Sequence, residues 1–126
     1  MNILDKILSH KKTEIEKIPE IHLESSNFKR LSLKKALKRD KISIIAEIKF
    51  ASPSEGIILK KGEHIQIAKD YENAGAAAIS VLTDRRFFNG DIKFLKDIKN
   101  AVNIPVMQKD FICLLYTSDA ADDMQC

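Results

Sequence analysis

The N-terminal part of the chain carries apolar residues at helical spacing, separated by charged residues. The longer apolar stripe consists of Ile3, Leu4, Ile7, Leu8, Ile15 and Ile18. This spacing predicts an amphipathic helix with Asn2 as its N-cap, Asp5 in its first turn and Pro19 at its end. A second, shorter stripe consists of Leu33, Ala36 and Leu37. It predicts a short helix that Ser32 is placed to cap, so residues 1–41 are expected to form a helical extension.

From residue 42 on, the pattern changes to short apolar runs that alternate with amphipathic stretches. Residues 42–48, 77–82 and 104–108 are rich in isoleucine, valine or alanine and predict three strands. The first run is apolar on both faces, as buried parallel strands tend to be. Loops are expected over residues 50–61 and 83–90, which contain glycine and polar residues.

The stretches between these strands predict two helices. Their apolar positions are Ile65, Ile67, Ala68, Tyr71 and Ala74 in the first, and Ile92, Leu95, Ile98 and Val102 in the second. Gly75 marks the C-terminal stop of the first helix. Helices that alternate with strands are crossover connections, so the strands are expected to be parallel. The glycine motifs of nucleotide-binding folds are missing, which leaves a (β/α)8 TIM barrel as the favoured α/β fold, with residues 42–112 as its first βα units.

Positive charge is concentrated in the helical extension. Residues 1–41 hold 11 Lys or Arg residues against 6 Asp or Glu residues, whereas the net charge of the whole chain is only +3. A basic segment can bind nucleic acid. However, the chain has no tryptophan, its aromatic content is 6%, and these lysines alternate with the apolar stripe. We therefore interpret them as a solvated helix face and expect no nucleic-acid partner.

The two cysteines, Cys113 and Cys126, form neither a CxxC pair nor a metal-ligand pattern. A disulfide framework is not expected, and a reducing cytoplasm fits this composition. Asp5 and Lys6 interrupt the first apolar run, which argues against a signal peptide. No stretch is long and apolar enough to span a bilayer, so no membrane partner is expected.

Charged residues lie where two predicted strands end: Glu47 and Lys49 at the first, Lys109 at the third. Residues i and i+2 of a strand share a face, and the inward residues of alternate barrel strands form one layer. Two lysines and a glutamate would therefore meet in one pocket. Desolvation and neighbouring positive charge favour proton loss from a lysine, which suits a general acid near neutral pH. The alternatives are a structural ion pair between Glu47 and Lys49 and an exposed loop position for Lys109.

Hydroxyl and aromatic residues follow the first two predicted strands. Ser52, Pro53 and Ser54 would direct hydroxyl groups into the mouth of a barrel, although an ordinary turn has the same composition. Phe87 and Phe88 are adjacent in a loop, so one of them must face water or a ligand. They would either anchor the loop to the core or contact a planar aromatic substrate.

The histidines, His10, His22 and His64, lie far apart in the sequence. No Asp or Cys is spaced to form a catalytic triad or a zinc site with them. We interpret all three as surface residues and expect no bound metal.

Three motifs, taken in order, resemble a known family. IIAEIKFASPSEG, AGAAAISVLTDRRFFNGD and IPVMQKDFI closely resemble the first three βα units of indole-3-glycerol-phosphate synthases, enzymes of tryptophan biosynthesis. NILDKILSHKKTEIE is similar to the helical segment that precedes the barrel in that family. The resemblance runs from about residue 2 to Ile112, and the succession of ExKxxSPS, SVLTDxxFFxG and KDFI is specific rather than a general barrel pattern.

The resemblance implies conversion of 1-(2-carboxyphenylamino)-1-deoxyribulose 5-phosphate to indole-3-glycerol phosphate, with loss of carbon dioxide and water. No cofactor is implied, and the partner is a small anionic phosphosugar. By the same resemblance, Lys109 is the general acid at the ribulose carbonyl, Lys49 contacts the anionic groups and serves as a second acid, and Glu47 orients the lysines. The residues implied to line the substrate pocket are Ser52, Phe88 and Phe111.

The resemblance ends at Ile112. Residues 113–126 read CLLYTSDAADDMQC and are expected to be a non-native tail, from a frameshift or from translated adapter sequence. The family's general base and phosphate site come from later strands, so this chain alone is expected to be inactive or nearly so. The parent protein is expected to be a monomer, whereas an open three-stranded parallel sheet is expected to self-associate.

Two other hypotheses stay open. The chain would also fit another phosphosugar-binding TIM barrel, such as an isomerase or epimerase, although the ExK pair followed by SPS argues against it. A non-catalytic interaction module, in which the basic helix over residues 2–18 binds an acidic partner, is the third hypothesis.

Overall fold

The structure is a computed structural model, and it describes residues 1–18 and 30–112. The chain divides into two compact units, and each is described by itself. One unit consists of Met1–Phe28 with Phe111–Cys126, and the other is Lys29–Asp110. Pro19, His22 and both cysteines lie outside the described residues, so the predictions made for them stay predictions.

The first unit contains the predicted N-terminal helix, α1 (Ile3–Glu16). Asn2 caps it as expected, because its side-chain oxygen accepts a hydrogen bond of 2.9 Å from the backbone N–H of Asp5. The helix ends at Glu16, before Pro19. Within the helix, His10 and Lys11 both pair with Glu14. Pairs at this spacing stabilise a helix by a few tenths of a kcal/mol, about 0.2–0.5 for each pair.

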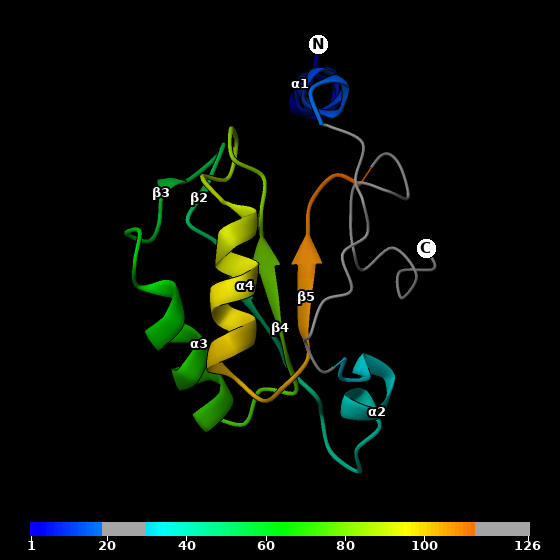
Figure 1. The fold of residues 1–126 in the computed structure, drawn as a ribbon, viewed down its shortest axis with the longest axis vertical. Helices are drawn as coiled ribbons and strands as arrows, with labels where there is room; N and C mark the ends of the chain where they lie inside the picture. Colours follow the sequence, from blue (N-terminus) through cyan, green and yellow to red (C-terminus); the bar gives the residue numbers. More distant parts are fainter. Residues whose placement is uncertain (19–29, 113–126) are drawn as a thin grey trace. The chain divides into compact units, whose positions relative to one another are not determined.

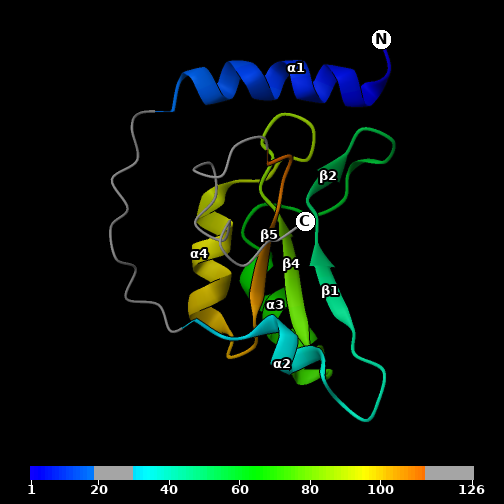
Figure 2. The same cartoon turned by 90° about the vertical axis from the view of Figure 1, so that its right-hand side faces the viewer.

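The second unit is built on a parallel sheet of three strands, β1 (Ile45–Ile48), β4 (Ala78–Leu82) and β5 (Val106–Lys109), in the order β1-β4-β5. Figure 2 shows the three strands side by side. The parallel arrangement and the three predicted strands are thus confirmed. The position of β4 between the other two follows from the two crossover connections, which each return the chain to the adjacent strand.

The first strand is shorter than predicted. Only Ile45–Ile48 pairs with β4, although the prediction covered residues 42–48. Ile42 is 90% exposed, and before Ile45 the carbonyl of Ile44 accepts a hydrogen bond of 2.8 Å from the N–H of Ala77. An isoleucine-rich run forms a strand only where a partner strand continues the ladder. The third strand is shifted and slightly shorter than predicted, because β5 begins at Val106 and ends at Lys109.

Helices α3 (His64–Asn73) and α4 (Ile92–Ala101) cover one face of this sheet (Figure 1). Gly75, with a φ of +93°, ends the α3 segment in the left-handed conformation that glycine adopts without strain. The helices and strands together enclose one apolar core, whose buried members are Ile48, Phe50, Ala68, Ile79, Val81, Ile98 and Val102. Both helices were predicted from their apolar spacing and are confirmed.

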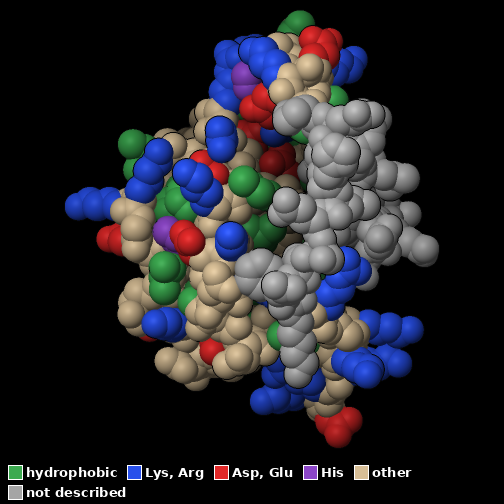
Figure 3. Space-filling view, viewed as in Figure 1, with side chains coloured by type: hydrophobic (Ala, Val, Ile, Leu, Met, Phe, Trp, Pro, Cys, Tyr) green, Lys and Arg blue, Asp and Glu red, His purple; other side chains and the backbone are tan. Residues whose placement is uncertain are grey.

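Two further elements complete the unit. The predicted loop over residues 50–61 contains a short antiparallel hairpin, β2 (Ala51–Ser52) with β3 (Gly56–Ile57), which the sequence did not predict. Helix α2 (Leu33–Leu37) was predicted, and Ser32 caps it by accepting a hydrogen bond from the N–H of Lys35. Lys and Arg side chains gather over α2 in Figure 3. Within the described residues, no helix is both long and apolar enough to cross a membrane.

Candidate active site at the carboxyl ends of the strands

The two faces of the sheet differ in chemistry because side chains alternate along each strand. Ile48 packs into the core beneath the helices, so its neighbour Glu47 projects from the opposite face. Val106 also packs against the core, which places Lys109, three residues later, on the same face as Glu47. Glu47 and Lys109 thus share the face of the sheet that lies opposite α3 and α4.

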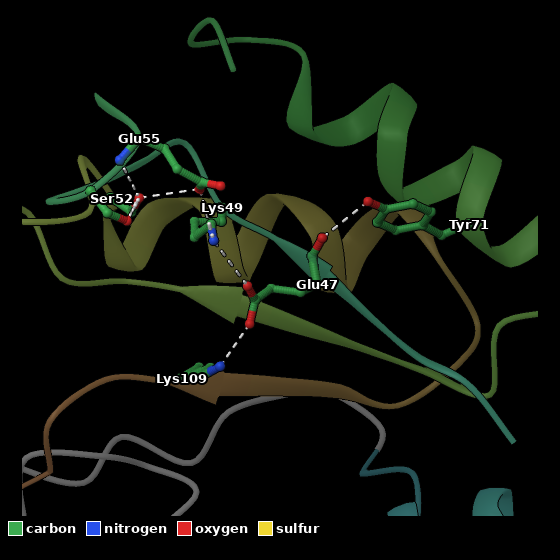
Figure 4. Close-up of polar contacts among 7 residues, drawn as sticks. Glu47, Lys49, Ser52, Glu55, Tyr71 and Lys109 are labelled. Carbon is green, nitrogen blue, oxygen red and sulfur yellow. Dashed lines mark hydrogen bonds and ion pairs between the residues drawn. The ribbon is translucent and has the colours of Figure 1, made fainter. Parts of the chain in front are cut away.

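Glu47 lies between the two lysines that the sequence singled out (Figure 4). Nζ of Lys109 donates a hydrogen bond of 2.7 Å to Oε2 of Glu47, and Nζ of Lys49 lies 3.9 Å from Oε1. Lys49 follows β1, whereas Lys109 closes β5, and β4 lies between these strands. The structure therefore brings together the three charged residues from alternate strands, as predicted. Their roles in a reaction stay predictions at this point.

The exposure of this cluster limits what it contributes to folding. Lys109 is 56% exposed at its side chain, and Glu47 and Lys49 are each about one third exposed. Ion pairs of this exposure contribute about 0–1 kcal/mol to stability. A purely structural ion pair is therefore a weak explanation for two lysines that converge on one carboxylate.

Ser52 extends the cluster through the β2–β3 hairpin. Its buried hydroxyl accepts a hydrogen bond of 3.1 Å from the backbone N–H of Glu55 and donates one of 3.2 Å to Oε2 of Glu55. The same carboxylate oxygen lies 3.4 Å from Nζ of Lys49. Sequence reasoning missed Glu55. The available signal was the spacing, because the side chain of a serine can accept a hydrogen bond from the backbone N–H of a residue a few positions later, which places Glu55 next to Ser52.

The loop after β4 is fixed against the carboxyl ends of the strands. The N–H of Gly90 donates to the carbonyl of Asp84 at 2.7 Å, and the N–H of Phe87 donates to Oδ1 of the same residue at 2.8 Å. A Cβ atom on Gly90 would lie 2.4 Å from the carbonyl oxygen of Leu82, so only glycine fits there. The carbonyl of Phe88 accepts a hydrogen bond of 3.2 Å from the N–H of Ala51, which joins this loop to the first one.

A polar network fixes the end of β5, and with it Lys109. The hydroxyl of Thr83 donates a hydrogen bond of 2.8 Å to Asp110, and the side-chain amide of Gln108 donates one of 3.1 Å to the same hydroxyl. The N–H of Thr83 also donates to the carbonyl of Lys109. Since these groups are largely buried and hydrogen-bonded, the strand end is held more rigidly than a loop would be.

Ser80 is a further polar residue on the same face. It pairs in register with Glu47 across β1 and β4, and it is 4% exposed. Its hydroxyl has no hydrogen-bond partner within the described part of the chain. A buried, unpaired hydroxyl costs about 1–3 kcal/mol. The sequence did not single it out, because serine within an apolar run has no spacing signature.

Of the two aromatic residues implied for the pocket, Phe88 is half-buried in the loop after β4. Phe111 belongs to the other unit of the chain, and its role stays a prediction. The neighbouring Phe87 ring has the guanidinium of Arg86 at 5.5 Å from its centroid. This is the distance of a cation–π contact, which favours a structural role for Phe87 in its own loop.

The prediction that His64 is a surface residue is wrong. His64 is 5% exposed, and its Nε2 lies 2.9 Å from Oδ2 of Asp97. Its ring also packs against Phe50 and Phe94, at centroid distances of 5.8 and 4.6 Å. The error arose because Asp97 lies 33 residues further along the chain and meets His64 only where α3 packs on α4. His10, by contrast, is partly exposed on α1.

Two titratable groups on the helix side of the unit have shifted pKa values. Asp91 caps α4 by accepting a hydrogen bond from the backbone N–H of Lys93. This hydrogen bond holds the pKa of the Asp91 carboxyl below the ordinary value, and the nearby Arg85 lowers it further. Burial lowers the pKa of Lys99, because the charged form loses hydration. No group of three or more possible metal-ligating side chains occurs among residues 1–18 and 30–112.

A groove of about 410 Å³ lies at the other end of the sheet, where the strands begin. Its lining residues come from α2 and from the segments that lead into β4 and β5: Leu31, Ser32, Lys35, Ala36, Arg39, Ala77, Asn103, Ile104 and Pro105. Ligands of parallel α/β sheets bind at the carboxyl ends of the strands. The charged cluster, rather than this groove, is therefore the candidate active site.

Comparison with known proteins decides the family. The sequence model described as indole-3-glycerol phosphate synthase matches residues 4–126, almost the whole chain. This chain belongs to the indole-3-glycerol phosphate synthase family. The resemblance found in the three motifs is thus confirmed, and the parallel α/β unit is part of the TIM barrel of that family.

Several curated relatives carry the name indole-3-glycerol phosphate synthase. The relative from Geobacillus sp. is 48% identical over 112 residues, which cover 87% of this chain and 43% of the relative. The relative from Ruminiclostridium cellulolyticum is 45% identical over 118 residues, covering 86% of this chain and 45% of the relative. The relative from Endomicrobium trichonymphae is 44% identical over 120 residues, covering 87% and 46%. The chain therefore spans less than half the length of these relatives.

Proposed function

We propose that this chain supplies the first part of the active site of an indole-3-glycerol phosphate synthase. The reaction closes the indole ring of 1-(2-carboxyphenylamino)-1-deoxyribulose 5-phosphate and releases carbon dioxide and water. The observation that carries the proposal is the position of Glu47 between Lys49 and Lys109 at the carboxyl ends of alternate strands. Active sites of TIM barrels lie at this end of the strands. The cytoplasm is the proposed compartment.

Lys109 is the proposed general acid. Ring closure turns the ribulose carbonyl oxygen into a hydroxyl, which then leaves as water, and each step needs a proton at that oxygen. The ammonium of Lys109 holds such protons, and its 2.7 Å hydrogen bond to Glu47 fixes its direction. A fixed donor needs little reorganisation during the reaction, which is how a preorganised site lowers a barrier.

Lys49 is the proposed partner of the substrate's negative charges and a second acid. Its ammonium lies between the carboxylates of Glu47 and Glu55, and the carboxylate of Glu55 also accepts a hydrogen bond from the hydroxyl of Ser52. Ser52, Phe88 and Phe111 are the proposed pocket residues around it. The ammonium of Lys49 and the hydroxyl of Ser52 are both directed at a carboxylate oxygen of Glu55, so the same two groups could bind an oxygen atom of an anionic ligand.

The chain alone is proposed to be inactive or nearly so. It spans only 43–46% of the length of the relatives compared above. A general acid without its general base, and a substrate without its phosphate site, should lose most of the rate. Incubation of the purified chain with the substrate should therefore yield no product above the uncatalysed rate, and clear turnover would contradict this part of the proposal.

A chimera tests the active part of the proposal. Residues 1–112 of this chain would be joined to the remainder of the Geobacillus sp. relative, so that the barrel is complete. We expect the chimera to form indole-3-glycerol phosphate, and Lys109→Met to lower its kcat/KM by about 10²–10⁴-fold, the usual contribution of a general acid. Circular dichroism should show that the variant keeps its fold.

The matched control is Lys93→Met, which changes an exposed lysine on α4 in the same unit. It should leave kcat/KM within about twofold of the parent chimera. A folded chimera without activity, or a Lys109→Met variant with full activity, would contradict the proposed role. Activity on an isomerase or epimerase substrate instead would favour the alternative phosphosugar enzyme.

A further inference from the structure

Glu55 has an unusual position for an exposed glutamate of a hairpin turn. One of its carboxylate oxygens contacts both Ser52 and Lys49, at 3.2 and 3.4 Å. These are two of the groups to which the proposed function assigns substrate binding. Figure 4 shows the carboxylate of Glu55 directed at them from the turn of the β2–β3 hairpin.

The hairpin holds this carboxylate in place. The hydroxyl of Ser52 accepts a hydrogen bond from the backbone N–H of Glu55 and donates one to its side chain, which closes a local ring. Gly56, with a φ of +69°, lets the chain turn sharply directly afterwards. The side chain is therefore bound at both its backbone and its carboxylate, although most of its surface is exposed to solvent.

From this geometry we infer that Glu55 is a specificity-determining residue that occupies the place of a ligand carboxylate at Lys49 and Ser52. This inference rests on the proposed function, which identifies Lys49 and Ser52 as substrate-binding groups. In addition, it assigns to Glu55 the role of an internal competitor for these two groups. A ligand carboxylate must displace that of Glu55 before it can accept from the same hydroxyl and ammonium. Glu55 thus weakens the binding of anionic ligands and excludes those too weakly charged to displace it.

The negative charge of Glu55 also weakens the binding of an anionic ligand. Its carboxylate adds a negative charge 3.4 Å from the lysine that must attract the ligand. Like charges at a binding site reduce affinity, and the competing contact must also be broken. Partly exposed pairs of this kind contribute up to about 1 kcal/mol, so their removal should tighten anion binding by about three- to fivefold.

The decisive variant is Glu55→Gln, because glutamine can still accept the hydrogen bond from Ser52 while it removes the charge. The probe is 2-aminobenzoate, titrated into the isotope-labelled 126-residue chain while the NMR signals of the Lys49 side chain are followed. We expect saturable binding that is about three- to fivefold tighter in Glu55→Gln than in the parent chain. The gain should vanish when Lys49→Met is added.

Glu63→Gln is the matched control. Glu63 also lies in unit Lys29–Asp110, but its carboxylate accepts from the backbone N–H of Lys60 at 3.2 Å. It should leave the affinity for 2-aminobenzoate unchanged. Equal or weaker binding in Glu55→Gln, a gain that survives Lys49→Met, or no saturable binding to Glu55→Gln would each overturn the inference.

A kinetic measurement in the chimera gives a second, independent readout. A competitor that must be displaced by both substrate and transition state changes KM and leaves kcat alone. Glu55→Gln should therefore lower KM about three- to fivefold with kcat unchanged, and a fall in kcat would contradict the inference. If the chimera makes no product at all, the proposed function fails, whereas the 2-aminobenzoate titration still decides the role of Glu55.

Discussion

The two faces of the sheet are made by the same strands but differ in chemistry. On the helix side, Ile48, Ile79 and Val81 are fully buried in one apolar core. On the opposite side, Glu47 and Lys109 are partly exposed and bound to each other. Adjacent residues of a strand project to opposite faces, so one alternation separates the apolar groups that hold the unit together from the charged groups for which we propose binding and catalysis. Changes on one face should therefore affect stability, and changes on the other should affect function.

The largest expected effect is on the helix side. Phe50 is fully buried and stacks on Phe94 with the ring centroids 4.5 Å apart. Phe50→Ala should lower the free energy of unfolding by about 3–5 kcal/mol, because it removes buried apolar surface and leaves a cavity. Chemical denaturation followed by circular dichroism would measure this loss.

The control for that change is Ile42→Ala, which truncates a residue that is 90% exposed. It should alter the unfolding free energy by less than about 0.5 kcal/mol. If Phe50→Ala and Ile42→Ala lowered the free energy of unfolding by similar amounts, the core of residues 30–110 would not be the main source of stability. The proposed difference between the two faces of the sheet would then be wrong.

An intermediate effect is expected at the cap of α4. Asp91→Ala removes the hydrogen bond of 2.9 Å that the carboxylate accepts from the N–H of Lys93, which should cost about 1 kcal/mol at neutral pH. The pKa of Asp91 is lowered in the folded chain, first by this hydrogen bond and then by Arg85. Its contribution is therefore present above the ordinary carboxyl pKa and is lost as the pH falls through the lowered value.

Thermal unfolding of both proteins between neutral pH and about pH 2 would follow this loss. The difference between the parent chain and Asp91→Ala should narrow toward the acidic end. Asp91→Asn is the matched control, since asparagine is also a good N-cap, and its effect at neutral pH should be the smaller one. If the difference in thermal stability between the parent chain and Asp91→Ala grew on acidification, the pKa of Asp91 would have to be raised by folding, which would contradict this prediction.

The smallest change in stability is expected on the opposite face. Glu47→Gln keeps the shape of the side chain but removes the charge between the two lysines. Because the cluster is partly exposed, the free energy of unfolding should fall by less than about 1 kcal/mol. In the chimera, the same variant should lose activity. A stability loss of more than about 2 kcal/mol would instead favour a structural ion pair, as in buried networks.

The sequence predicted which helices and strands this chain forms better than it predicted where they begin and end. Helical spacing and capping residues located α1 and α2, since both depend on neighbours in the sequence. The strand over residues 42–48 was predicted too long, because strand formation at Ile42 depends on a partner that is distant in sequence. The hairpin after β1 was missed because its strands have only two residues each, too few to show an alternating pattern.

For the candidate site, the sequence predicted the members but not all of their contacts. Glu47, Lys49 and Lys109 were predicted to meet, because strand alternation and barrel layers are regular. Glu55 was missed, since its contact with Lys49 depends on the turn of the hairpin. The burial of His64 was missed because its partner lies on another helix. Regular geometry can be read from spacing, whereas contacts made through loops and helix crossings require the fold.

The hydroxyl of Tyr71 donates a hydrogen bond of 3.0 Å to the backbone carbonyl of Glu47, as Figure 4 shows. It comes from α3, whose Ile67 and Ala68 pack on the apolar core. The outer helix is thereby tethered to the main chain of the residue that holds both lysines. A displacement of α3 along its axis would pull on that peptide group and on the backbone from which the carboxylate of Glu47 projects.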